Sequence, residues 1–241
     1  MLPDNEKNQI IDLAKEIRLK HFTPNPSYLK VNIDEFPHIF FLGCLMDRQI
    51  PYEKAFNIPN IIAQEIGYNF SSFASKDKNF YVNYFNSNRL HRFNNQMAIN
   101  FYEAVQKINN EYNGNAANIW NDNPSSTTLL KRLKSFKGIG TSIANMIINI
   151  LERRGFIKID RIGIDISPDR NVLRVITNMG LINKPSQKEA INVARIISPE
   201  YPGLLDKLFW EIGRFYCLED NRKCNICYIR KYCNIGKGMY N

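Results

Sequence analysis

Four cysteines near the C-terminal end are the most specific chemical feature of this 241-residue sequence. They follow the spacing C-x6-C-x2-C-x5-C and are Cys217, Cys224, Cys227 and Cys233. So many thiols in one short stretch favour a shared metal centre, because bound metal offsets the repulsion between thiolates. Zinc suits the C-x2-C pair and a [4Fe–4S] cluster suits four cysteine ligands, so spacing alone leaves both open. The fifth cysteine, Cys44, lies in an apolar stretch and is expected to be a core residue.

A glycine hairpin is the second candidate site. Lys137, Gly138, Ile139 and Gly140 stand between two helical patterns, and Thr141 is expected to cap the second helix. The N–H groups of such a turn and of the following helix start would bind an anion, and a nucleic-acid phosphate is the natural one. That contact positions a duplex without reading its sequence. On this motif alone, an ordinary helical hairpin with a glycine C-cap is an equal alternative.

A carboxylate follows the hairpin. Asp169 comes after Pro168 and opens a helical pattern at 169–180, where an ordinary N-cap would also stand. The helix N-terminus is expected to keep this carboxylate ionised. Asp160 and Asp165 are rival carboxylates in the preceding loop.

The elements that must position these groups are predicted to be helical throughout, so we expect an all-α fold. Only 156–166 alternates in polarity, which is compatible with a short hairpin or an extended loop. The segment 23–34 carries two prolines and is expected to cross between parts of the chain. The predicted helices are 5–22, 36–49, 51–56, 59–66, one or two within 68–92, 94–112, 129–136, 141–150, 169–180, 185–198 and 202–216.

The composition favours a polyanionic partner. Lys and Arg number 32 against 23 Asp and Glu, which gives a net charge of +9, although many basic proteins bind no nucleic acid. No apolar run reaches the length of a membrane span, and the N-terminus has no signal-peptide pattern. We therefore expect a cytoplasmic protein whose cysteines are metal ligands rather than disulfides.

The hairpin, the following Asp and the terminal cysteine loop, in that order, resemble the endonuclease III (HhH-GPD) superfamily of DNA glycosylases. The segment LDKLFWEIGRFYC is similar to the family's helix, which ends in a Gly-Arg-aromatic-x-Cys pattern. The resemblance implies two α-helical lobes: a six-helix barrel at 34–150 with the hairpin at 129–150, and an iron–sulfur lobe from 1–33 plus 151–241. It favours a [4Fe–4S] cluster on loop 217–233 over zinc. It also implies a nucleoid-associated monomer that acts in base-excision repair on double-stranded DNA containing a damaged or modified base.

The resemblance also implies roles for single residues. The sequence PDRNVLRV matches the family's Val-Asp-Thr-His-(apolar)-x-Arg-Val, which makes Asp169 the catalytic carboxylate and places Arg174 among the DNA contacts. Asp169 would stabilise the oxocarbenium-like sugar and orient or deprotonate water. Bifunctional members carry a nucleophilic lysine where this chain has Ser142, which cannot form an imine. The resemblance therefore implies a monofunctional glycosylase, with Lys137 as a phosphate contact or a substitute amine.

The remaining assignments concern base recognition and length. Gln49 stands where the family has a Gln that fills the gap left by a flipped nucleotide, although an exposed helix end is nearly as good an explanation. Cys44 replaces the glutamate of the adenine-specific branch, which disfavours mismatched adenine as substrate. The stretch between Ser142 and Asp169 is longer than usual, with an insertion within 153–167 that is expected to contact DNA or shape the pocket. A bifunctional enzyme using another lysine and a non-catalytic lesion-binding module of the same fold are the alternatives.

Overall fold

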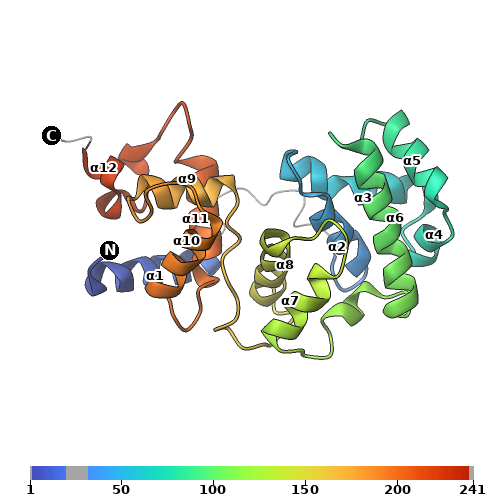
Figure 1. Ribbon diagram of the computed structural model, residues 1–241, viewed down its shortest axis with the longest axis horizontal. Coiled ribbons are helices and arrows are strands. Elements are labelled where there is room, and N and C mark those ends of the chain that lie inside the picture. The colour runs from blue at the N-terminus through green and yellow to red at the C-terminus, as the bar shows by residue number, and fades with distance from the viewer. Residues whose placement is uncertain (1, 20–31, 239–241) are drawn as a thin grey trace. The chain divides into compact units, whose positions relative to one another are not determined.

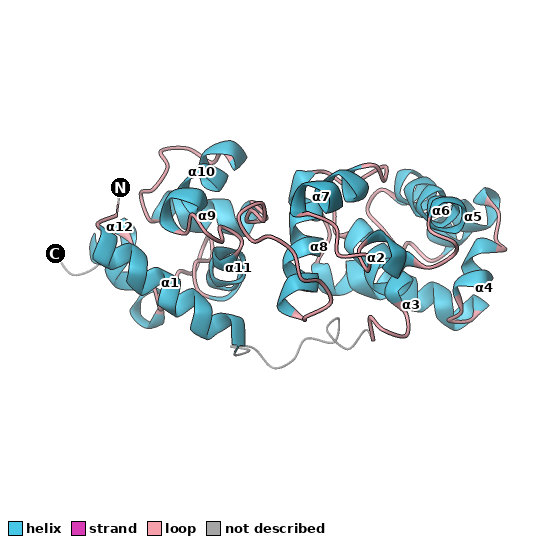
Figure 2. Ribbon diagram, turned by 90° about the horizontal axis from the view of Figure 1, so that it is seen from below, coloured by secondary structure: helices cyan, strands magenta, loops and turns pink. Residues whose placement is uncertain are grey.

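The computed structural model describes residues 2–19 and 32–238, and every regular element in these ranges is a helix (Figures 1 and 2). The all-α prediction is confirmed. The loop 156–166 forms no strand, and the sole β-bridge among the described residues joins Cys217 to Arg222. Residues 20–22 of the first predicted helix and most of the expected crossing segment lie outside the described residues. No described helix is both long enough and apolar enough to span a membrane.

The chain forms two compact units. One unit joins helix α1, Asp4–Leu19, to the residues from Ile148 onward, and the other runs to Ile147. The division falls inside helix α8, Thr141–Arg153.

The unit that ends at Ile147 is built around helix α2, Pro37–Met46, in which all ten residues are buried. Helix α3, Tyr52–Ile66, packs against it as one continuous helix. The sequence prediction of two helices separated at Pro59 is wrong here. A proline inside a helix costs about 3 kcal/mol, and the buried side chains of the α3 face, Pro59 itself among them, outweigh this cost.

Helices rich in aromatic residues complete this unit. Tyr81, Phe85 and Phe101 are fully buried, and the Phe101 ring contacts the other two, so two of the four aromatic residues in 80–85 belong to the core. Hydrophobic periodicity in 94–112 predicts an inward face, and its residues are all buried: Met97, Ala98, Phe101, Ala104, Val105 and Ile108. The elements are α4 Phe70–Ala74, α5 Lys78–Ser87, α6 Asn94–Glu111, η2 Ala116–Ile119 and α7 Ser126–Lys134.

The second unit is centred on helix α11, Leu204–Phe215, which packs against α1 and α9. A Cβ on Gly213 would lie 2.6 Å from the Asn171 carbonyl oxygen, so only glycine lets α9 and α11 approach this closely. The connection from α8 to α9 is an extended loop, tied down where Asn149 Nδ2 donates to Asp165 O (2.8 Å). The other elements are α9 Arg170–Asn178, α10 Gln187–Ile197, η3 Cys224–Ile226, η4 Arg230–Tyr232 and α12 Asn234–Gly238.

Candidate active site and metal centre

The glycine hairpin lies where predicted, between α7 and α8. Gly138 has φ 95°, and a Cβ there would lie 2.7 Å from Asn100 Nδ2, so both the conformation and the packing require glycine. Ile139 is buried and donates its N–H to Phe136 O (3.1 Å), which anchors the turn. Gly140 has no atom within 4 Å of an added Cβ, so this side of the turn is open.

The open side of the hairpin leads directly into α8. Thr141 is the first residue of this helix rather than its cap, because Gly140 supplies the carbonyl that accepts the N–H of Ala144 (3.0 Å). The first N–H groups of a helix have no intrahelical partner and attract anions. Ser142 is half-buried in this first turn, and Lys137 forms an exposed ion pair with Glu103 (3.2 Å).

Gln49 is exposed in the turn after α2 and has φ 56°, which is uncommon for a residue other than glycine. Two interactions of the Met46 carbonyl oxygen hold this turn: it contacts His91 Nε2 (3.1 Å) and accepts the N–H of Arg48 (2.7 Å). Cys44 is fully buried, and burial raises the pKa of its thiol well above the ordinary range, as fits the predicted core role.

Asp169 is the N-cap of α9. Its Oδ1 accepts the N–H of Val172 (2.8 Å), and its Oδ2 accepts from Asn171 Nδ2 (3.4 Å). Burial raises the pKa of this carboxyl above its ordinary value, while these hydrogen bonds and Arg174 act in the opposite direction. The expectation that the helix N-terminus keeps Asp169 ionised did not include this desolvation, which opposes the effect of the helix.

The rival carboxylates have other surroundings. Asp165 is buried and makes a bidentate pair with Arg195, with both N–O distances at 2.8 Å. Asp160 is exposed on the loop. Asp169 is thus the carboxylate of this group that caps a helix.

Three charged side chains on α11 were missed from the sequence. Asp206 is 8% exposed, and its Oδ1 accepts the N–H of Ser167. Burial is the main cause that raises its pKa to about 7; Asp169 adds to the rise, and Ser167 and Arg153 oppose it. Lys207 and Glu211 lie 3.6 Å apart and are also largely buried. The signal was available, since helical periodicity places these charges among apolar residues.

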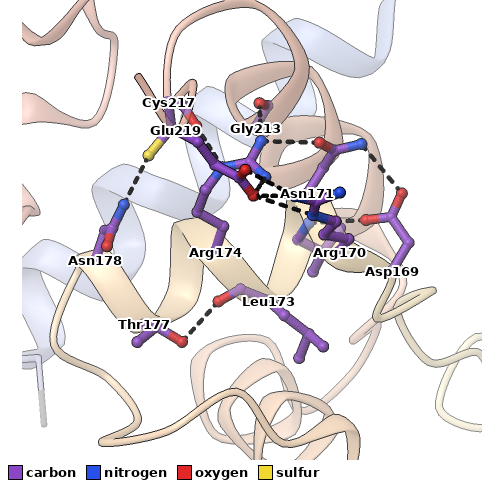
Figure 3. A network of polar contacts seen from close by, with 11 residues as sticks. Asp169, Arg170, Asn171, Leu173, Arg174, Thr177, Asn178, Gly213, Cys217 and Glu219 are labelled. Carbon is purple, nitrogen blue, oxygen red and sulfur yellow. Dashed lines mark hydrogen bonds and ion pairs between the residues drawn. The ribbon is translucent and has the colours of Figure 1, made fainter. Parts of the chain in front are cut away.

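Arg174 lies in a network that joins α9 to the start of the cysteine loop (Figure 3). Its guanidinium donates to Asn171 Oδ1 (2.9 Å), Gly213 O (2.6 Å) and Cys217 O (2.6 Å), and its side chain is 15% exposed. Beside it, Arg170 forms a bidentate pair with Glu219. These bonds occupy the Arg174 guanidinium, so we infer that it holds the loop in place rather than contacting DNA.

The four loop cysteines are free thiols that interact electrostatically. Burial raises the pKa of Cys227 to about 11, and the other three thiols add to this rise. Asn178 makes two contacts with this group, both at 3.2 Å. Its side-chain Nδ2 donates to Cys217 Sγ, and its backbone carbonyl oxygen accepts from Cys233 Sγ. Within 2–19 and 32–238, no three His, Cys, Asp or Glu side chains are arranged to hold a single metal ion.

The long loop before α9 is anchored through Glu152 on α8. Arg161 donates to Glu152 Oε1 (3.0 Å), and Tyr201 and Arg18 both donate to Oε2. Arg161 lies in the insertion 153–167 that was expected to contact DNA or shape the pocket, and its guanidinium is already paired with Glu152.

No family model matches the sequence, but it is similar to one curated protein. The chain is 28% identical over 147 residues to an endonuclease III of Buchnera aphidicola subsp. Schizaphis graminum (strain Sg). This match covers 59% of the chain and 60% of the relative.

Solved structures match over nearly the full length. A trapped endonuclease III–DNA covalent intermediate has a TM-score of 0.66 at 15% identity and covers 100% of both chains. A non-covalent endonuclease III–DNA complex has 0.67 at 16%, with 99% of both chains covered. A thermostable thymine-DNA glycosylase has 0.68 at 14%, with 97% of this chain and 98% of that one covered. The chain therefore has the fold of these endonuclease III and thymine-DNA glycosylase structures, and part of its sequence is similar to an endonuclease III.

Proposed function

We propose that this protein is a DNA N-glycosylase of base-excision repair, with Asp169 as its catalytic carboxylate. The observation that carries the proposal is the placement of Asp169 as the N-cap of α9, partly desolvated, on the endonuclease III fold. Its carboxylate is held by the Val172 N–H, so its orientation is fixed before any substrate binds. The similarity to an endonuclease III and to glycosylase–DNA complexes supports double-stranded DNA with a damaged or modified base as substrate.

The chemistry is hydrolysis of the N-glycosidic bond of a flipped nucleotide. As the bond from C1′ to the base breaks, its electron pair leaves with the base and positive charge develops on the sugar. The Asp169 carboxylate stabilises that charge and accepts a proton from the water that attacks C1′. Ser142, in the first turn of α8, offers no amine, which supports water as the nucleophile and a monofunctional enzyme.

The hairpin supplies the binding energy that holds the duplex. The open backbone at Gly140 and the N–H groups at the start of α8 bind a DNA phosphate, and exposed Lys137 adds positive charge. Gln49 is exposed in a turn with positive φ, and in this proposal its side chain fills the gap left by the flipped nucleotide.

Cys217, Cys224, Cys227 and Cys233 would hold a [4Fe–4S] cluster. The fit rests on four mutually interacting thiols and on N–H groups that already point at their sulfurs, from the Asn178 side chain and from the backbone of Ile229, Ile235 and Gly236. When bound, such a cluster would cross-link the loop and neutralise the thiolates. A brown protein that absorbs near ~400 nm supports this assignment. Colourless protein with stoichiometric zinc would overturn it.

The decisive experiment uses pure protein and a panel of duplexes, each carrying one modified base. Each reaction is divided and analysed with and without hot alkali. Strand cleavage that requires alkali shows a free abasic site, as water attack predicts. Cleavage without alkali, together with covalent trapping by borohydride, would show an amine nucleophile and refute the monofunctional assignment.

Two variants test the catalytic carboxylate. Asp169→Asn keeps a good helix cap but lacks the charge, so we expect excision to fall by at least about a hundredfold while duplex binding persists. Asp160→Asn, on the exposed part of the same loop, is the matched control and should excise normally. Unchanged excision by Asp169→Asn would refute its catalytic role. Salt-dependent binding of an abasic duplex without excision of any base would favour the non-catalytic module.

A further inference from the structure

Asp206 is a buried carboxyl group that the proposed mechanism does not use. It lies in the first turn of α11 and is 8% exposed. A carboxylate is costly to bury, and an apolar side chain of similar size would serve packing better. Buried titratable groups of this kind are concentrated at functional sites.

Two consecutive hydrogen bonds connect Asp206 to Asp169. Asp206 Oδ1 accepts the N–H of Ser167, and Ser167 O accepts the N–H of Asp169 (2.7 Å). The same loop is held at a second point, where Gly203 donates its N–H to Ile164 O (2.7 Å). The backbone that carries Asp169 is therefore fixed to the N-terminal end of α11.

The charges that face Asp206 come from three elements. Arg153 at the end of α8 favours the ionised form, and Asp169 at the start of α9 disfavours it. On α11 itself, Lys207 and Glu211 form their own pair and both interact with Arg153. The two aspartates thus form an interacting carboxyl pair, in which burial raises the pKa of each and Asp206 reaches about 7.

We propose that Asp206 is a positioning residue for Asp169, which holds its backbone through Ser167 and supplies a second titratable carboxyl beside it. This inference rests on the proposed glycosylase function. Asp169 has the helix-cap hydrogen bonds and loses its proton first. Asp206 loses its proton at higher pH, and the second negative charge then strengthens Asp169 as a base and stabilises the developing cation.

The test is the pH profile of single-turnover excision. In the wild type, the rate rises in two steps, one as Asp169 ionises and a second near neutral pH. Asp206→Asn keeps an acceptor for the Ser167 N–H but cannot ionise, so the second step disappears. We expect the rate at pH 8.5 to be about tenfold below the wild type, from the loss of one unit charge that acts on the site at an effective dielectric of ~20.

Glu211→Gln is the matched control, because Glu211 is a buried carboxyl on the same helix that pairs with Lys207. Its profile should keep both steps, since a purely structural effect of removing a buried charge would not act on one pH step alone. A wild-type profile for Asp206→Asn, or loss of the upper step in Glu211→Gln as well, overturns the proposal.

A second measurement does not depend on activity or on the folding of the Asp206 variant. Carboxyl carbon NMR follows the titration of Asp206 in the wild type and in Asp169→Asn. Removing the neighbouring charge should lower the pKa of Asp206, and an unchanged titration would refute the coupling. If no duplex is excised but Asp206 still responds to Asp169→Asn, the glycosylase proposal fails while the carboxyl pair stands.

Discussion

Replacing Asp206 with Asn should stabilise the protein relative to the wild type at alkaline pH, and this gain should shrink as the pH falls. Its carboxyl is buried, which raises its pKa to about 7 in the folded chain. The unfolded chain ionises it near its ordinary value, about 3.9. A group with a raised folded pKa stabilises the fold fully below the unfolded pKa, and this contribution is lost as pH rises through the folded pKa. Asp206→Asn stays neutral and does not show this loss.

The size of the effect follows from the same two values. Three pKa units correspond to about 4 kcal/mol of unfolding free energy between acid and alkaline pH. Between pH 5.5 and pH 8.5, roughly half of this range is crossed, so the variant should gain about 2 kcal/mol over the wild type.

Urea denaturation of the protein at several pH values measures this difference. Asp12→Asn, on the exposed face of α1, is the control, and its stability should follow the wild type at every pH. A difference between Asp206→Asn and the wild type that does not change with pH would refute the reasoning, because it would show that Asp206 has the same charge in the folded and unfolded chains.

Three further predictions concern packing, a buried ion pair and the cysteine loop. Gly213→Ala would force a Cβ against the backbone of α9 and should cost about 3 kcal/mol, whereas Gly238→Ala, with no atom within 4 Å, should leave the melting temperature unchanged. Glu152→Gln should cost about 3 kcal/mol in urea denaturation because it removes a buried carboxylate and leaves the partly buried Arg18 without its counter-charge. Its control, Glu111→Gln, breaks only an exposed pair on α6 and should have no measurable effect. Asn178→Ala removes an N–H donor from a loop sulfur, so voltammetry should find a more negative reduction potential for the proposed cluster; an unchanged potential would contradict this role.

Local patterns in the sequence were sufficient for the fold class and for most helices. Hydrophobic periodicity located α6 and its buried face, and the Pro168–Asp169 pair located the start of α9. These features depend on interactions within a few residues of the chain. Pro59 shows the limit of such reasoning, because a local helix-breaking preference was overridden by burial against α2.

The sequence by itself determined the chemical groups on offer: four loop thiols, a glycine hairpin and a carboxylate at a helix start. Only the tertiary structure decided the surroundings of those groups. In the folded chain, Arg174 donates hydrogen bonds to carbonyl oxygens of α11 and the cysteine loop. Asp206 is linked to Asp169 by hydrogen bonds through Ser167, which lies 39 positions from Asp206 in the sequence. Desolvation and charge interaction act through space between residues distant in the chain, so no pattern along the sequence contains them.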